Sequence, residues 1–322
     1  MSFESVKALV GDDLRQVDHV IRQRLASDVV LVNQIAEYIV GGGGKRLRPL
    51  VVVVAARACG YTGERHAEAA AIIEFIHTAT LLHDDVVDGS TLRRGRDTAN
   101  EVWGAEASVL VGDYVYSRAF EMMVELDNMR IMDVMATATN RIAEGEVLQL
   151  MNAHDPETTE ERYFDVIYRK TAKLFEAGTQ IAAILAGADA AVESGMARYG
   201  KHLGTAFQLI DDVLDYRADR DELGKNLGDD LAEGKPTLPL IYALKMGTNE
   251  QRAVVRASIE QGGAPDLPRI TAAIESTGGL AYTARLARRE AALAVEALAD
   301  LPDSAYKQAL RELADFAVER TY

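Results

Sequence analysis

The sequence is poor in cysteine and proline. Its 322 residues include one cysteine, Cys59, so no disulfide can form within the chain, and 7 prolines, so few positions interrupt a helix. The small neighbours Ala58 and Gly60 predict that Cys59 is a buried apolar residue and not a nucleophile. These scarcities exclude a disulfide-stabilised scaffold and favour long helices, which the abundant alanine also supports.

Long apolar runs and net positive charge are missing too. No run reaches the roughly 18 apolar residues of a membrane span, and the N-terminal stretch MSFESVKALVGDDLRQ has neither the basic nor the apolar region of a signal peptide. The net charge of −15 argues against general nucleic-acid binding, although local basic clusters can still bind anions. We therefore expect a cytoplasmic protein with no transmembrane segment and no nucleic-acid partner.

Helical periodicity dominates what is present. A single all-α domain over residues 1–322 is predicted, because neither a Pro/Ser-rich linker nor a repeat of roughly 20–50 residues occurs. The valines of Val51–Val54 have strand propensity, yet we expect a helix there because Pro49 suits a first turn and alanines follow. Helices are expected over about 3–25, 29–39, 47–59, 64–88, 105–126, 130–152, 159–186 and 192–217, with several more from 238 to 320.

Two acidic stretches share one pattern, DDxxD at the end of an apolar helix. They are LLHDDVVDGSTLRRG, residues 81–95, and FQLIDDVLDY, residues 207–216. Carboxylates one helical turn apart repel each other, and their apolar neighbours partly desolvate them, so a cation must compensate. Oxygen donors without cysteine favour Mg²⁺ over zinc. A solvated helix end is the alternative for either stretch alone, but two copies favour a metal site. The predicted metal-binding residues are Asp84, Asp85, Asp88, Asp211, Asp212 and Asp215.

Basic residues accompany both acidic stretches. Mg²⁺ usually completes its shell with phosphate oxygens, which the arginine fork also matches. Four glycines precede the first basic group, in GGGGKRLRP, residues 41–49, so backbone amides can approach an anion there, although a flexible hinge is the alternative. A P-loop, a Ser/His/Asp order and a reactive cysteine are all missing. The sequence thus predicts a helical protein that binds Mg²⁺ and more than one polyphosphate through Lys45, Arg46, Arg48, Arg93, Arg94, Lys170, Lys225 and Lys235.

These motifs resemble those of the trans-prenyltransferases, the head-to-tail isoprenyl diphosphate synthases, and among them the bacterial octaprenyl diphosphate synthases. The resemblance extends from about Gly41 to Leu240, with GGKRxRP, DDxxD–RRG, KTA, the second DDxxD and GKPTLP in family order. It implies the all-α isoprenoid-synthase bundle around a deep central cavity, usually in a homodimer. It further implies that the aspartates hold three Mg²⁺ ions on an allylic diphosphate.

The resemblance also assigns the two substrates. The allylic diphosphate ionises to a carbocation, isopentenyl diphosphate attacks it through its double bond, and the released diphosphate takes the proton. An isolated histidine such as His77 is more often a packed core residue, so its binding role depends on the resemblance. Isopentenyl diphosphate is expected at Lys45, Arg48, His77 and Arg94. The allylic diphosphate is expected at Arg93, Lys170, Thr171, Gln208, Lys225 and Lys235.

Product length depends on the residues that precede the first motif. Short-chain members of the family carry aromatic residues at the fourth and fifth positions before the first aspartate, whereas this chain has Thr80 and Ala79, so its cavity is expected to stay open. Phe120, Met123 and Met135 are the expected floor, with ordinary core packing as the alternative. We expect a C40 product made from a primer such as farnesyl diphosphate for quinone side chains, with C35, C45 and C50 as alternatives.

Two other classes of protein share the resemblance in part. A terpene cyclase of the same fold generally lacks the second full DDxxD and the Lys45, Arg48 and His77 set, which are present here. A non-catalytic subunit of a heteromeric synthase usually has degraded aspartate motifs, and these are intact. The sequence therefore favours the synthase.

Overall fold

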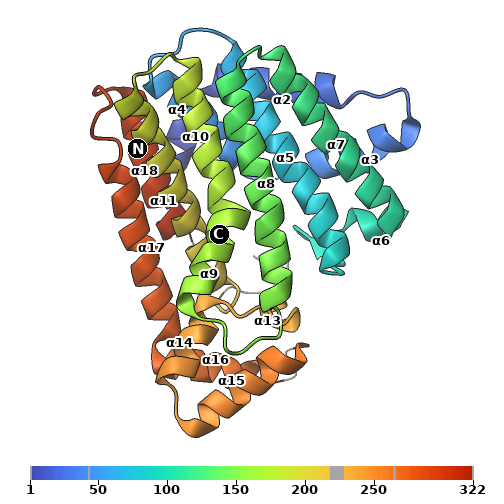
Figure 1. The fold of residues 1–322 in the computed structure, drawn as a ribbon, viewed down its shortest axis with the longest axis vertical. Coiled ribbons are helices and arrows are strands. Elements are labelled where there is room, and N and C mark those ends of the chain that lie inside the picture. Colours follow the sequence, from blue (N-terminus) through green and yellow to red (C-terminus); the bar gives the residue numbers. More distant parts are fainter. Residues whose placement is uncertain (1, 43, 218–227, 264–265, 321–322) are drawn as a thin grey trace. The chain divides into compact units, whose positions relative to one another are not determined.

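The computed structural model describes residues 2–42, 44–217, 228–263 and 266–320. The chain forms two compact helical units (Figure 1), and each is assembled from separate segments. The first unit consists of Met1–Thr139, Leu174–Gly200 and Ala297–Leu313, and the second of Asn140–Lys173, Lys201–Glu296 and Ala314–Tyr322. The predicted single domain over residues 1–322 stays a prediction.

Helices make up almost all of the described regular structure, as predicted. The helices that come before the second acidic stretch, and the one that carries it, are α1 (Phe3–Leu9), α2 (Gly11–Leu25), α3 (Val30–Gly41), α4 (Leu47–Ala58), α5 (Arg65–Val87), α6 (Ala99–Trp103), α7 (Ala105–Glu125), α8 (Met129–Asn152), α9 (Glu160–Ile167), the π-helix η1 (Tyr168–Ala172), α10 (Lys173–Leu185) and α11 (Ala190–Leu214). The later helices are α13 (Asp229–Ala232), α14 (Leu238–Met246), α15 (Asn249–Gln261), α16 (Leu267–Thr277), α17 (Gly279–Glu296) and α18 (Ala305–Glu319). A two-stranded antiparallel hairpin joins β1 (Leu92–Arg93) to β2 (Arg96–Asp97).

Helix α5 is the centre of the first unit and carries the first acidic stretch at its C-terminal end. It packs most extensively against α7 and then against α4 and α2 (Figure 1). Its alanines and isoleucines are buried around the whole circumference, which is typical of a helix inside a core. Helix α4 includes the buried Val51–Val54 run, so the predicted helix is confirmed over the strand propensity of the valines.

Three local features differ from the sequence expectation. The first predicted helix is interrupted at Val10, which has φ −120° and ψ 27°, so α1 and α2 are separate helices that keep a similar periodicity. The helix expected over 159–186 contains the five-residue π-helix η1 between α9 and α10. The hairpin and the short helices α6 and α13 were not predicted, because each is too short to show a period.

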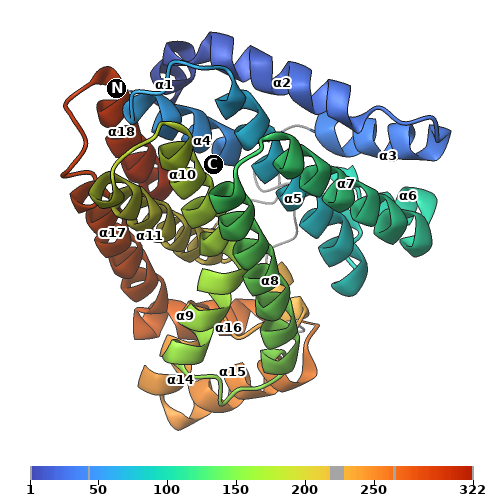
Figure 2. The ribbon, with the colours of Figure 1, turned by 45° about the horizontal axis from the view of Figure 1, so that its top comes forward.

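Two apolar clusters form the core of the second unit. In one of them Tyr163, Leu209, Leu214 and Leu238 pack together, which joins α9, α11 and α14 behind the second acidic stretch. In the other cluster α14 packs against α15, α16 and α17, which lie together in Figure 2. The acidic stretch on α11 is therefore backed by a rigid apolar layer.

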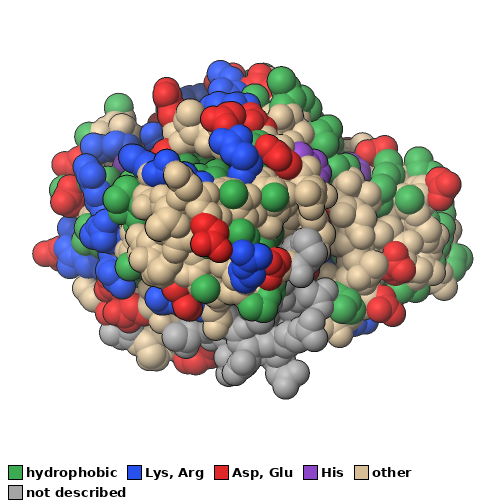
Figure 3. Space-filling view, turned by 90° about the horizontal axis from the view of Figure 1, so that it is seen from below, with side chains coloured by type: hydrophobic (Ala, Val, Ile, Leu, Met, Phe, Trp, Pro, Cys, Tyr) green, Lys and Arg blue, Asp and Glu red, His purple; other side chains and the backbone are tan. Residues whose placement is uncertain are grey.

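The surface carries both signs of charge. Lysine and arginine side chains gather along one edge of the face drawn in Figure 3, although the net charge is −15. Local basic regions thus exist on an acidic chain, as anion binding requires. Among the residues that the structure describes, none of the helices is both long enough and apolar enough to cross a bilayer.

Candidate active site

The first acidic stretch lies where α5 ends in a Schellman motif. The Ser90 N–H donates to the Asp85 carbonyl oxygen over 2.9 Å, and the Gly89 N–H donates to the Val86 carbonyl oxygen over 3.3 Å. Gly89 has φ 62°, the left-handed conformation that this motif requires and that glycine adopts without strain. The cap fixes the last helical turn, so Asp84 and Asp88 share one partly exposed face.

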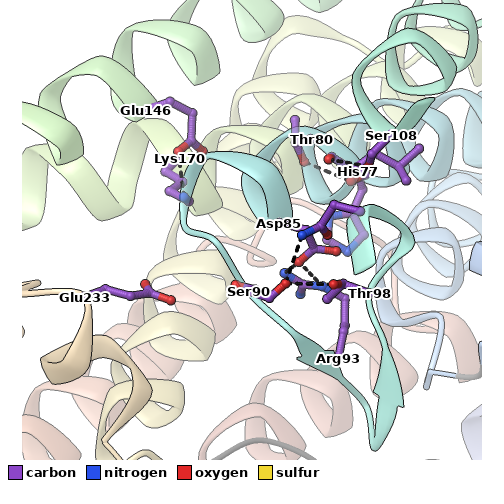
Figure 4. Close-up of polar contacts among 12 residues, drawn as sticks. His77, Thr80, Asp85, Ser90, Arg93, Thr98, Ser108, Glu146, Lys170 and Glu233 are labelled. Atoms are coloured by element: carbon purple, nitrogen blue, oxygen red, sulfur yellow. Dashed lines mark hydrogen bonds and ion pairs between the residues drawn. The ribbon is translucent and has the colours of Figure 1, made fainter. Parts of the chain in front are cut away.

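Asp85 points into the protein and is held by Arg93. Its side chain is fully buried, and its Oδ1 accepts hydrogen bonds from Arg93 Nε at 2.8 Å and Nη2 at 2.6 Å (Figure 4). Its Oδ2 is buried without a hydrogen-bond partner among the described residues. Arg93 reaches back because Arg94 and Gly95, both with positive φ, form the two-residue turn of the hairpin.

Arg94 packs against the glycine-rich stretch. Its guanidinium Nη1 lies 2.5 Å from the place where a Cβ on Gly44 would be, so any larger residue at position 44 would displace it. Gly44 also has φ 125°, which side chains rarely tolerate. Gly44 therefore permits close packing of the Arg94 cation. From the sequence alone, the glycines could have served either the approach of an anion or a flexible hinge.

A pocket of about 610 Å³, which includes space open to solvent, adjoins these groups in the first unit. Its lining includes Arg46, Glu74, His77, Arg93 and Arg94. Burial, Arg93 and Arg46 lower the pKa of Arg94, whereas burial raises the pKa of Glu74 against the effect of the arginines. The crowding of like charge that lowers the Arg94 pKa would be relieved by a bound anion.

His77 is neutral in this pocket and has a defined tautomer. Burial, followed by the charges of Arg48, Arg94 and Arg93, lowers the pKa of His77 well below its ordinary value. Arg48 Nη1 lies 3.0 Å from His77 Nε2, and because arginine can only donate, Nε2 accepts and Nδ1 carries the proton. Arg48 also lies over the Phe175 ring at 4.8 Å. Two residues predicted to bind isopentenyl diphosphate are thus in direct contact.

The second acidic stretch also contains both buried and accessible acids, but here two of the three, Asp212 and Asp215, are buried. Asp212 is 1% exposed and accepts hydrogen bonds from Tyr163 Oη at 2.5 Å and Gln208 Nε2 at 2.9 Å. Burial and the nearby Asp230 raise the pKa of Asp212 to about 8. Asp211 is more accessible, and its Oδ1 lies 2.6 Å from Arg320 Nη2.

A π-helical turn places two further predicted residues. In η1, Thr171 Oγ1 donates to Gln208 Oε1 over 2.9 Å, so Thr171, Gln208 and Asp212 form one hydrogen-bonded chain. Lys170 Nζ donates to Glu146 Oε2 over 2.6 Å (Figure 4). Single π turns inside α-helices often occur at functional sites, because the extra residue turns side chains away from the regular helical positions.

The remaining predicted binding residues lie in loops. Lys235 follows α13 and forms an ion pair with Glu233. Lys45 is exposed beside the glycine-rich stretch. Lys225 lies outside the described residues.

The donor set fits a hard divalent cation in part. Paired carboxylates on Asp84 and Asp88, and the unbonded Oδ2 of Asp85, are the oxygen donors that Mg²⁺ prefers. Among the described residues, however, no three Asp, Glu, His or Cys side chains converge closely enough to hold a metal by themselves. Each acid cluster would therefore need oxygen donors from elsewhere to complete the shell of a bound metal ion.

The residues predicted to control product length all lie in the first unit. Ala79 in α5, Met123 in α7 and Met135 in α8 are buried, at 0%, 1% and 0% exposure. Thr80 is partly exposed and donates to the His77 carbonyl oxygen over 2.8 Å, and the Phe120 ring lies 5.2 Å from Tyr116. Burial agrees with both a tunnel wall and ordinary core packing, so their role stays a prediction.

Sequence reasoning missed the residues that support the site. Tyr163, Glu146 and Arg320 hold Asp212, Lys170 and Asp211, but they come from 49, 24 and 109 positions away in the chain. Glu74 could have been found from the sequence, because it precedes His77 by three positions and so lies on the same face of the helix.

Comparisons with known proteins show the family of the chain. The Polyprenyl synthetase family model matches residues 29–275. Octaprenyl diphosphate synthase of Escherichia coli (strain K12) is 54% identical over 321 residues, which are 99% of this chain and 99% of that protein. All-trans-nonaprenyl-diphosphate synthase (geranyl-diphosphate specific) of Rhodobacter capsulatus is 48% identical and covers 98% of both chains.

A solved structure is similar over the whole chain. Polyprenyl synthase from Caulobacter crescentus CB15, complexed with calcium and isoprenyl diphosphate, has a TM-score of 0.96 and 44% identity over 100% of this chain and 98% of that one. These similarities confirm the all-α fold class, the synthase resemblance and the enzyme class that the motifs predicted. The chain belongs to the polyprenyl synthetase family and is a prenyltransferase.

Proposed function

We propose that this chain is an octaprenyl diphosphate synthase, which condenses isopentenyl diphosphate onto an allylic diphosphate such as farnesyl diphosphate. The geometric observation that carries the proposal is the pocket in which Arg46, Arg93 and Arg94 surround the neutral His77 next to the buried Asp85. Such a pocket binds a diphosphate beside a cluster of metal-binding carboxylates. The extent of identity to the Escherichia coli enzyme supports the C40 product.

Isopentenyl diphosphate is assigned to the cations of the first unit. Arg48 and Arg94 offer forked donors to phosphate oxygens, Lys45 adds an exposed charge, and the Nδ1–H of His77 is a neutral donor. A neutral imidazole binds the diphosphate without adding to the crowded positive charge. Arg46 lines the same pocket and joins this set.

The acids divide into ligands and supports. The partly exposed Asp84, Asp88 and Asp211 are assigned to Mg²⁺ together with Asp215, which is buried at 7% exposure, with three ions per site. The buried pair Asp85 and Asp212 holds the motifs in place through Arg93 and through Tyr163 and Gln208. A divalent cation supplies neutralisation of the departing diphosphate. The Caulobacter crescentus relative was crystallised with calcium and isoprenyl diphosphate, which supports a divalent cation here.

Residues of the chain assist the ionisation step directly. Arg93, Lys170, Lys225 and Lys235 are assigned to the allylic diphosphate, where their charges stabilise the leaving group. Thr171 and Gln208 present oxygen dipoles, fixed by their mutual hydrogen bond, toward the allylic cation. Attack by the double bond of isopentenyl diphosphate forms the new C–C bond. A proton then leaves the adjacent carbon for the released diphosphate, so no protein base is needed.

A longer product is the second candidate. The Rhodobacter capsulatus relative is named as a nonaprenyl synthase at 48% identity, so a C45 product is the nearest alternative. The small side chains of Ala79 and Thr80 are compatible with a product of either length. Phe120, Met123 and Met135 are proposed to set the maximum product length. The predicted homodimer and the cytoplasmic location stay predictions, and exposed Leu110 and Val124 of α7 are available to a second copy.

Transfer of labelled isopentenyl diphosphate tests the reaction class. Purified protein with farnesyl diphosphate and Mg²⁺ should extend the primer, and EDTA should abolish the extension. Cyclic hydrocarbons formed without isopentenyl diphosphate would instead identify a terpene cyclase. Inactivity that a second protein restores would identify a non-catalytic subunit.

A further inference from the structure

We propose that His154 is a positioning residue that orients Lys235, a role that rests on the proposed function of Lys235 in allylic diphosphate binding. His154 follows α8 in the loop before α9, whereas Lys235 follows α13, and both belong to the second unit. The two residues are far apart in the sequence, and His154 belongs to neither acidic stretch.

Two hydrogen bonds join His154 to elements far away in the chain. Its backbone N–H donates to the carbonyl oxygen of Gly234 over 2.9 Å, so it fixes the peptide that leads into Lys235. Its Nδ1 lies 3.0 Å from the carbonyl oxygen of Ile259 in α15, and since a carbonyl only accepts, Nδ1 carries the proton. His154 therefore bridges the Lys235 loop, through its backbone N–H, and α15, through its imidazole.

Glycines make room for this ring. A Cβ on Gly234 would collide with Nδ1 of His154, and a Cβ on Gly262 would lie 3.1 Å from its Cε1. Gly234 and Gly262 also have φ 70° and 66°, so side chains are disfavoured there twice over. The loop is shaped around the histidine.

The backbone of His154 is held in an uncommon conformation. Its φ is 63°, in the left-handed region that histidine, asparagine and aspartate enter more readily than most residues. The flanking residues are tied down, because Arg162 donates to Asn152 at 2.5 Å and to Asp155 at 2.9 Å. His154 and the Gly234 peptide that it holds, which together we call the clamp, are thus anchored to the end of α8 and to α9, which also carries Tyr163.

The backbone around Lys235 completes the clamp. The Lys235 N–H donates to the Asp230 carbonyl oxygen over 2.8 Å, and the Gly234 N–H donates to the Leu231 carbonyl oxygen over 2.9 Å. With the Gly234 carbonyl oxygen held by His154, both sides of the peptide before Lys235 are fixed. That peptide helps to orient the Cα–Cβ bond from which the Lys235 side chain extends.

Three substitutions separate the contributions of the ring and the backbone. His154→Ala loses the donor and strains the left-handed backbone, so the KM for farnesyl diphosphate should rise about three- to tenfold, with the KM for isopentenyl diphosphate unchanged. His154→Asn should retain most of the wild-type value, because its amide N–H replaces Nδ1–H and asparagine tolerates this φ. His154→Gly keeps the conformation without the donor and should be intermediate. His19→Ala, at an exposed histidine of α2, is the matched control.

A purely structural histidine would give a different pattern. Equal changes in both KM values with a lower melting temperature, or no change in His154→Ala, would overturn the proposal. Amide hydrogen exchange at Gly234 and Lys235 supplies a readout without substrate, and it should accelerate in His154→Ala but not in His154→Asn. If the wild-type protein transferred no isopentenyl diphosphate, the proposed function would fail, while unchanged exchange would refute the clamp separately.

Discussion

At the scale of single residues, each DDxxD motif contains both accessible and buried carboxylates. Asp85 and Asp212, the second acid of each motif, are almost completely buried and accept charged or neutral hydrogen bonds from the protein. Asp84 and Asp211 remain accessible on the same helices. A buried carboxylate that loses its donors is strongly destabilising, so the second acids matter first for structure.

Removing an accessible acid should therefore damage the reaction and spare the fold. Asp84→Ala or Asp211→Ala should lower kcat about 10²- to 10³-fold, because each removes stabilisation of the developing diphosphate charge. Steady-state rates, with thermal unfolding as the check on folding, give the answer. Asp133→Ala, at an exposed acid of α8, is the control. Near-normal turnover in a folded Asp84→Ala protein would contradict the metal assignment.

Substitutions of the two groups of cations should affect different substrates. Arg48→Leu should raise the KM for isopentenyl diphosphate, and Lys170→Leu should raise the KM for the allylic diphosphate, each about tenfold or more, as expected for a hydrogen bond to a charged group. The measurement varies one substrate at a time at saturation of the other. If both variants weakened both substrates equally, the two groups of cations would be wrongly assigned.

The sequence predicts the residues of this site better than their partners. Residue chemistry and local spacing predicted Asp84, Asp211 and Arg93 as site residues, because residue type and period are visible within a single segment. The partners of the second acidic stretch were not predictable: Tyr163, which bonds Asp212, and Arg320, which bonds Asp211, meet α11 only through tertiary packing. The neutral state of His77 was likewise hidden, since its lowered pKa depends on burial and then on the charge of Arg48 from α4.

At the scale of elements, short irregular features orient the predicted side chains. The Schellman motif ends α5, the Arg94–Gly95 turn directs Arg93 back to Asp85, and η1 turns Lys170 toward Glu146. The long helices around them were predicted within a few residues, because burial periodicity extends over many turns. The irregular features were not, since each depends on one or two backbone angles.

Helix α5 should also set the product length. If Ala79 lines the tunnel, Ala79→Tyr should stop growth at C15 to C20, because a rigid ring obstructs a narrow apolar space that is packed at high density. Products are resolved by chain length, and Met123→Ala should lengthen or broaden the distribution instead. Unchanged long products from a folded Ala79→Tyr protein would place the growing tail elsewhere.

At the scale of the whole molecule, a buried polar cluster links the N-terminal helices of the first unit. His66 Nε2 donates to Asp13 over 2.8 Å, and Arg57 bonds the same carboxylate, which ties α2, α4 and α5 together. Burial, and then the charge of Arg57, lowers the pKa of His66 below 6.5, while its bond to Asp13 partly opposes this. The histidine is therefore neutral in the folded protein near neutral pH.

This cluster predicts a pH dependence of stability. Below about pH 6.5 the unfolded chain protonates His66 more readily than the folded protein does, so the free energy of unfolding should fall as the pH drops. His66→Gln keeps a donor to Asp13 but does not titrate, so its loss of melting temperature between pH 7.5 and 5.5 should be smaller than in the wild type. An equal loss in both proteins would show that other groups cause the acid sensitivity.

The product spectrum of the purified enzyme tests the central assignment most directly. With Mg²⁺, farnesyl diphosphate and labelled isopentenyl diphosphate, the long-chain synthase should release mainly all-trans C40 diphosphate, formed by five successive additions to the C15 primer. A distribution centred on C45 would keep the reaction and correct the length. Products that stop at C20, or an absence of chain extension under these conditions, would contradict the account.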